Sequence, residues 1–104
     1  MNHQEFLNAI QNMSLVKITF KTKESNEKDL ITRTCAPMDY GPSKKDGITK
    51  YHFWDYNSDE GPHPLSLTAS QIIRMIVLED QFEPSGFVTW KPNWIIKRNW
   101  GRYS

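Results

Sequence analysis

The sequence has a single cysteine, no long apolar run and no overall excess of basic residues. Cys35 alone cannot form an intramolecular disulfide, which excludes a disulfide framework and fits a reducing compartment. No apolar stretch reaches the length of about 18 residues that a transmembrane helix needs. Residues 1–13 lack a basic segment followed by an apolar one, so they do not resemble a secretory signal. We therefore expect a cytoplasmic protein that does not associate with membranes.

Motifs for catalysis and cofactor binding are also missing. His3, His52 and His63 are spread along the chain without an HxH or HExxH pattern, so the sequence encodes no local metal site. The stretch MDYGPSKKDG has only one glycine before its lysines and does not match a phosphate-binding loop of the Walker type. No nucleophile and base can be paired from the spacings. We expect no cofactor and no metal, and a small enzyme is the least favoured of three functional classes.

The chain instead has many aromatic residues and an uneven distribution of charge. Its 104 residues, 38% hydrophobic and 12% aromatic, suit one globular domain with one modest core. Residues 1–85 hold nine basic and twelve acidic residues, a net charge of −3. Residues 86–104 hold four basic residues and no acid, a net charge of +4. The basic character is therefore local, unlike that of a dedicated DNA-binding protein.

The apolar pattern predicts one short helix followed by strands. Asn2 can cap a helix over residues 2–13, with Glu5 in the capping-box position and apolar residues at helical spacing. From residue 14 the pattern changes to the two-residue period of a strand. Residues 14–22 and 29–37 should form an antiparallel hairpin, with Pro37 ending the second strand. Residues 48–57 form a third strand with aromatic residues on both faces, and residues 65–68 a short fourth one.

The last part of the chain is less clear in its periodicity. In residues 71–82, apolar side chains occur at both odd and even positions, so the period alone does not distinguish a strand from a helix. The β-branched residues favour a strand. Two further short segments surround the break at Pro92. The order of elements predicts a mainly β fold, a small SH3/Sm-like antiparallel barrel over residues 14–85. A short N-terminal helix precedes this barrel, and residues 86–104 form an aromatic and basic C-terminal extension.

Five stretches of the chain resemble a known family over about residues 5–82. They match, in order, the family's short helix, its first strand, a strand running into a proline, its aromatic strand and its return strand. The stretches are Leu7–Ile10, Val16–Phe20, Arg33–Pro37, Tyr51–Phe53, and Leu65–Leu67 with Gln71 and Ile72. On these residues the sequence resembles the WYL-type domain, an Sm/SH3-like barrel of bacterial regulators. The resemblance implies a domain that senses a small anionic or nucleotide-like ligand.

Several residues are candidates for a ligand surface, each with a structural alternative. Arg33 shares a strand face with Cys35, so it is either paired with an acid, which we favour, or directed at an anion. His52 lies between aromatic residues, where a hydrogen-bonded structural role is favoured. Cys35 is expected to be a small buried hydrophobic residue. The acids of residues 39–60 are expected to be solvated loop charges. The candidate ligand-binding residues are Arg33, Tyr51, His52, Trp54, Lys97 and Arg98.

The C-terminal stretch WKPNWIIKRNWGRYS allows three interpretations. Interleaved tryptophan, lysine and arginine can stack single-stranded bases and hold phosphates. The favoured alternative is that Trp90, Trp94, Ile96 and Trp100 pack on the barrel while Lys97, Arg98 and Arg102 stay in solvent. A protein-partner surface is the third. We therefore expect a non-enzymatic binding or regulatory module for a small anionic ligand or a protein partner. A single-stranded nucleic-acid binder is the alternative.

Overall fold

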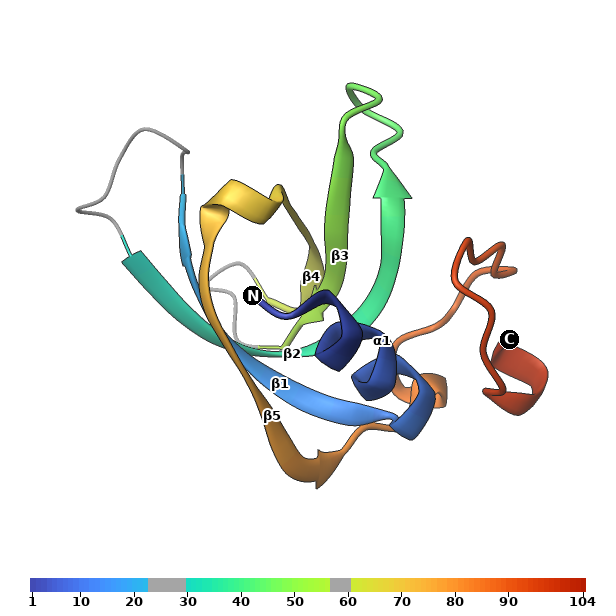
Figure 1. Ribbon diagram of the computed structural model, residues 1–104. Helices are drawn as coiled ribbons and strands as arrows, with labels where there is room; N and C mark the ends of the chain where they lie inside the picture. The colour runs from blue at the N-terminus through green and yellow to red at the C-terminus, as the bar shows by residue number, and fades with distance from the viewer. Residues whose placement is uncertain (23–29, 57–60) are drawn as a thin grey trace.

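The computed structural model describes residues 1–22, 30–56 and 61–104. The fold is mainly β, with one α-helix and a single antiparallel sheet (Figure 1). The strands are β1 (Ser14–Lys21), β2 (Leu30–Pro42), β3 (Thr49–Asp55), β4 (His63–Leu67) and β5 (Ile72–Gln81). Their order in the sheet is β4-β3-β2-β1-β5. Acidic residues 59 and 60, expected to be loop charges, lie outside the described residues.

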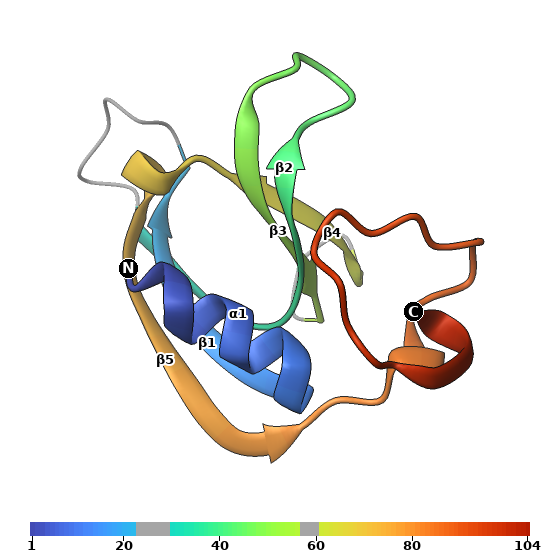
Figure 2. The same ribbon diagram turned by 45° about the vertical axis from the view of Figure 1, so that its right-hand side comes forward.

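The helix α1 (His3–Asn12) confirms the N-terminal prediction. Its first turn is capped by the Asn2 side chain, which accepts a hydrogen bond from the Glu5 backbone N–H at 3.2 Å. It ends at Met13, whose φ of 53° lies in the left-handed region. Phe6 and Ile10 are buried, and α1 lies on the concave side of the curled sheet (Figure 2). Docking on the sheet stabilises a helix too short to be stable alone.

The strands largely follow the predicted pattern. The hairpin of β1 and β2 is confirmed, with Val16 opposite Cys35 and Phe20 opposite Ile31. The segment after residue 71 is a strand, as favoured. The prediction that Pro37 ends the second strand is wrong, because β2 continues to Pro42. The register shifts between Pro37 and Asp39, and a proline without an N–H is tolerated at such an irregularity.

The sheet is not closed. Its two edges are β4 and β5, which follow each other in the chain through the 3₁₀ turn η1 (Ala69–Gln71). The Gln71 side chain donates to the backbone carbonyl of Lys21 at 3.1 Å and so ties this turn to the end of β1. The mainly β, antiparallel character of the prediction is thus confirmed, but the closed barrel is not: the structure has a curled, open five-stranded sheet.

The C-terminal segment (86–104) contains no strand, contrary to the expectation of further short strands. It has only two 3₁₀ turns at its ends, η2 (Pro84–Gly86) and η3 (Gly101–Tyr103). It runs as an extended loop beside the sheet, red in Figures 1 and 2. Side-chain contacts take the place of a ladder of backbone hydrogen bonds. Within the described residues, no helix combines the length and the apolar character of a membrane span.

Candidate functional site

The six predicted ligand-binding residues lie on three parts of the fold. Arg33 is on β2, and Tyr51, His52 and Trp54 are on the neighbouring strand β3. Lys97 and Arg98 lie in the C-terminal segment. The structure does not gather them into one pocket. Most of them have partners inside the protein, and this decides which surfaces stay available to a ligand.

Arg33 is paired with an acid, the favoured of its two predicted roles. Its Nε lies 3.6 Å from Oδ2 of Asp55, and the Asp55 side chain is almost fully buried. Asp55 was expected to be a solvated charge, and this prediction is wrong. The third strand ends at Asp55, directly opposite Cys35 on β2, and the carboxylate therefore faces the core. Removing Arg33 from this pair would leave a buried carboxylate without its partner charge.

Cys35 is fully buried, as predicted. Burial raises the pKa of its thiol far above the ordinary value, and the nearby Asp55 carboxylate raises it further. The thiol therefore stays protonated at neutral pH and is a poor nucleophile. Within residues 1–22, 30–56 and 61–104, no three His, Cys, Asp or Glu side chains come together as a metal site.

Tyr51 and His52 both serve the fold. Tyr51 is buried between α1 and the sheet, and its hydroxyl lies 2.7 Å from Nδ1 of His3. His52 Nε2 donates to the backbone carbonyl of Gly41 at 3.0 Å, and its Nδ1 lies 2.7 Å from the hydroxyl of Ser66. Both ring nitrogens are thus satisfied by neighbouring strands, which confirms the predicted structural role of this histidine.

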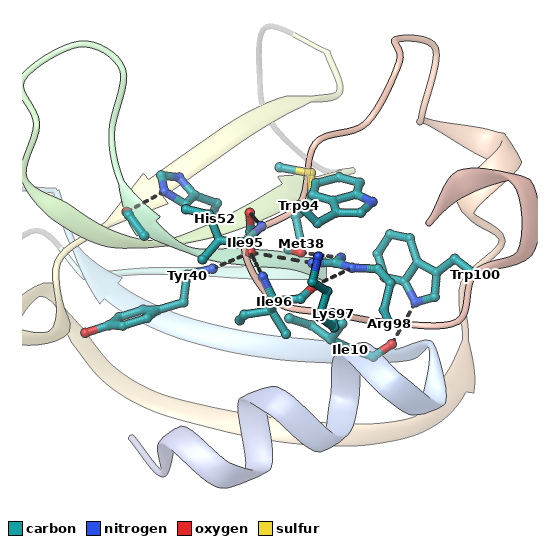
Figure 3. A network of polar contacts seen from close by, with 12 residues as sticks. Ile10, Met38, Tyr40, His52, Trp94, Ile95, Ile96, Lys97, Arg98 and Trp100 are labelled. Atoms are coloured by element: carbon teal, nitrogen blue, oxygen red, sulfur yellow. Dashed lines mark hydrogen bonds and ion pairs between the residues drawn. The ribbon is translucent and has the colours of Figure 1, made fainter.

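Arg98 is the most buried cation in the described part of the chain, with only 1% of its side chain exposed. Its guanidinium lies over two adjacent indole rings, 4.1 Å from the centroid of Trp94 and 4.4 Å from that of Trp100. It donates to the backbone carbonyls of Met38 and Ile96 (Figure 3). Burial lowers its pKa to about 10, and the neighbouring Asp39 opposes this shift. The expectation that Arg98 stays in solvent is wrong, because each of its three guanidinium nitrogens donates to a backbone carbonyl inside the protein.

Asp39 anchors the C-terminal segment to the sheet. Its two carboxylate oxygens accept hydrogen bonds from the backbone N–H groups of Ile95 and Ile96, both at 2.9 Å. One of them also lies 3.5 Å from Nη2 of Arg98. The prediction that Asp39 is a solvated loop charge is wrong, because this residue lies on β2 at the register shift. Apart from the adjacent Tyr40 N–H, which donates to Asp39 Oδ1 at 3.0 Å, these partners are more than fifty residues away in the chain, so no local pattern identifies this role.

Two further contacts join the segment to α1. The indole N–H of Trp100 donates to the backbone carbonyl of Ile10 at 2.8 Å, and only 4% of Trp100 is exposed. The side-chain amide of Gln11 donates to the backbone carbonyl of Lys97 at 2.6 Å. The interpretation that Trp94, Ile96 and Trp100 pack on the core is confirmed. They alternate with exposed residues as in a strand, although the backbone forms no ladder.

The remaining tryptophans form a partly exposed group, which we call the aromatic surface: Trp54, Trp90 and Trp94. Trp90 lies between the other two, with ring centroids 6.5 Å from Trp54 and 6.0 Å from Trp94. Trp54 stacks on Phe87, at 5.4 Å and an interplanar angle of 18°. Trp90 is 42% exposed, in contrast to Trp100. The sequence identified Trp54 as a candidate site residue, whereas the prediction that Trp90 packs on the barrel is wrong, because its ring contacts other tryptophans at the surface.

Exposed cations accompany the aromatic surface on the same segment. Lys91, Lys97 and Arg102 are all exposed, whereas Arg98 is enclosed. The guanidinium of Arg102 lies 5.7 Å from the ring centroid of Tyr103. The segment contains no acidic residue to neutralise these charges. An exposed indole and exposed cations on one segment are suited to an anionic partner that also offers an apolar or aromatic group.

Two hollows lie elsewhere on the surface. One, of about 560 Å³, runs between α1 and β5 and is lined by Glu5, Asn8, Arg74 and Ile76 among others. The other, of about 480 Å³, lies beside Tyr56 and Phe82. Neither contains any of the six predicted residues.

No family model, no curated protein and no solved structure matches this chain, so only its own geometry bears on its function.

Proposed function

We propose that the chain is a non-enzymatic interaction module on an open, SH3-like barrel, and that it binds an acidic protein segment at the aromatic surface. The observation that carries the proposal is the exposure of Trp90 in a chain that encloses Trp100 and half-buries Trp54 and Trp94. Tryptophan is the residue type most enriched among binding hot spots, and an exposed indole next to two others offers a large rigid contact area.

Charge supports an acidic partner. Lys91, Lys97 and Arg102 are exposed on a segment without acids. Such cations steer an anionic segment to the surface and raise the association rate. The resemblance to WYL-type domains would give such a module a role in bacterial regulation. The raised pKa of the Cys35 thiol and the internal bonds of His52 argue against nucleophilic catalysis.

The version of this function with a small anionic ligand is less favoured. It relied on Arg33 and Arg98 as the groups that bind the anion. Both already face carboxylates, Asp55 at 3.6 Å and Asp39 at 3.5 Å. An anion would have to displace these carboxylates, and separating a buried ion pair costs several kcal/mol.

The test is affinity capture from the native cells with three baits: the wild-type chain, Trp90→Ala and Trp90→Phe. Direct titration of each captured protein should follow. We expect a partner that wild type binds, that Trp90→Ala binds about tenfold or more weakly, and that Trp90→Phe retains in part. Ile73→Thr, on the distant β5, is the matched control and should bind like wild type. A set of captured proteins that is unaffected by Trp90→Ala would contradict the proposal.

A second candidate function uses the same surface. A single-stranded nucleic acid could stack a base on Trp90 and place phosphates near the three exposed cations. If all three contact phosphates, the logarithm of the affinity for a thymidine oligonucleotide should fall with the logarithm of salt concentration with a slope of about −2. Binding that is insensitive to salt, or no binding at low salt, would reject this candidate.

A further inference from the structure

The two edges of the sheet differ in how they are protected. β4 is only five residues long and contains Pro64, which has no backbone N–H to offer a neighbouring strand. β5 is ten residues long and contains neither proline nor lysine. Among the described strands, β5 pairs only with β1, so its other side is free (Figure 1). Long, unprotected edges are the ones that accept a further strand.

β5 is also held firmly at both ends. At its start, Gln71 is bonded to the backbone of Lys21. At its end, the Gln81 side chain donates to the carbonyl of Asn12 at 2.7 Å, and the Phe82 N–H donates to the carbonyl of Met13 at 2.9 Å. Three apolar side chains are exposed along β5: Ile73 is 47% exposed, Ile76 38% and Val77 40%. A fixed edge with exposed apolar side chains loses little entropy when another strand binds.

The register with β1 defines the two faces of β5. Met75 and Val77 lie opposite the buried Ile18 and Val16, so they point inward. Arg74 and Ile76 lie opposite Thr19 and Lys17, so they point outward. Further along, Gln81 lies opposite Ser14, which has the same parity as Val16. The alternation of inward and outward side chains is therefore kept across the register shift between Ser14 and Val16. Asp80 then shares the outward face of Arg74.

A second copy can pair with this edge in a charge-complementary register. When a two-fold axis relates two antiparallel strands in one sheet, facing residues share a face, so their numbers differ by an even amount. With the axis at Val77, this residue faces itself and Ile76 faces Leu78. Arg74 then faces Asp80 of the second copy, and this pair occurs twice. With the axis at residue 76 or 78, Arg74 would face Leu78 or Phe82 and lose the pairing.

We propose that the chain forms a two-fold homodimer in which β5 pairs antiparallel with β5 of a second copy, centred on Val77. The sheet then becomes a continuous ten-stranded one, with two Arg74–Asp80 ion pairs on its outer face and Ile76 packed against Leu78. Pairing between β5 and β4 of another copy is disfavoured, because Pro64 interrupts the donors of β4. This assembly is independent of the aromatic surface, which lies on β3 and the C-terminal segment.

The oligomeric state of the full chain tests the proposal by light scattering and sedimentation over a wide concentration range. Wild type should be a dimer that dissociates on dilution. Arg74→Asp and Asp80→Arg each replace two attractive pairs by repulsive ones, and each should weaken the dimer by on the order of tenfold or more. The double variant Arg74→Asp with Asp80→Arg regenerates both pairs and should restore dimerisation. A monomer at every concentration, or a dimer that these charges leave unchanged, would overturn the proposal.

A cysteine at the axis tests the register directly. Val77→Cys should form a disulfide-linked dimer under mild oxidation, because residue 77 faces its own copy at the spacing of a paired strand. Ile73→Cys is exposed on the same strand but would lie far from its copy, so it should stay monomeric on oxidation. Cys35 is buried in both variants and does not compete. Equal cross-linking of the two variants would contradict the register.

The outcome is separable from that of the proposed function. Trp90→Ala should leave dimerisation unchanged, and the charge-swapped variants should keep the aromatic surface intact. Loss of partner binding by Trp90→Ala with an unchanged dimer supports both inferences. A monomeric wild type that still binds its partner through Trp90 overturns the dimer alone.

Discussion

Trp90 and Trp100 are identical residues ten positions apart on the same segment, yet the fold treats them in opposite ways. Trp100 is 4% exposed and donates its indole N–H to α1. Trp90 is 42% exposed and contacts other tryptophans at the surface. The difference shows that one segment performs two tasks. Its second half, around the enclosed Arg98, closes the core, while its first half presents an aromatic group to solvent.

The largest expected effect is on stability, from truncation of the enclosed tryptophan. Trp100→Ala should lower the free energy of unfolding by about 3–5 kcal/mol, because it removes a buried ring and the hydrogen bond from its indole N–H to the Ile10 carbonyl. Trp90→Ala, the matched control, should cost less than about 1 kcal/mol. Chemical denaturation of both variants measures this. Similar losses for the two would break the comparison.

Cys35 gives an independent readout of the same difference. Because its buried thiol has a strongly raised pKa, it should react with a thiol reagent only when the core opens. A stability loss of about 3 kcal/mol should speed labelling of Trp100→Ala by roughly a hundredfold when opening is at equilibrium. Trp90→Ala should label at nearly the wild-type rate. Rapid labelling of the wild-type protein would show that the core is open on this side.

The next effect concerns the pair of Asp39 and Arg98. Asp39→Asn leaves the enclosed guanidinium without its counter-charge and should cost about 3 kcal/mol. Arg98→Met should cost less, about 1–2 kcal/mol, since the Asp39 carboxylate keeps its three backbone donors, from Tyr40, Ile95 and Ile96. The double variant should be more stable than the sum of the single losses predicts. Strict additivity in this double-mutant cycle would show that the two groups do not interact.

The smallest effect is at the contact between α1 and the segment. Gln11→Ala removes the hydrogen bond from the side-chain amide to the Lys97 carbonyl and should cost about 0.5 kcal/mol, since the group is exposed. Gln4→Ala removes an exposed bond within α1, from the Gln4 amide to Asn8, and serves as the control. Only Gln11→Ala should also loosen the C-terminal segment, measured as faster backbone amide exchange at residues 96–98. Equal exchange in both variants would contradict this.

Local pattern was sufficient to predict much of the fold. The capping residues predicted α1, and the two-residue period predicted β1 and the packing of Trp94, Ile96 and Trp100, but Trp90 was wrongly included with them. The same pattern failed to show that the C-terminal segment forms no strand, because alternation of burial requires an extended backbone but no neighbouring strand. It also failed at Pro37, where a register shift accommodates a proline that usually ends a strand.

The candidate site was harder to predict, for a physical reason. The roles of Arg33, Arg98 and His52 depend on partners distant in the sequence, namely Asp55, Asp39 and Ser66. A charge looks the same in sequence whether it faces solvent or a buried acid. For Arg33 the sequence allowed both an acid and an anion, and only the packing of β2 against β3 distinguishes them. Trp90 was not singled out because it shares its composition with its enclosed neighbours.

Hydrogen exchange of the indole N–H groups, followed by NMR, tests the division of the segment most directly. The N–H of Trp100, bonded to Ile10, and that of Trp94, bonded to the Tyr103 carbonyl at 2.8 Å, should exchange slowly. The N–H of Trp90 should exchange nearly as fast as that of an unstructured tryptophan. Equal protection of Trp90 and Trp100 would contradict the account.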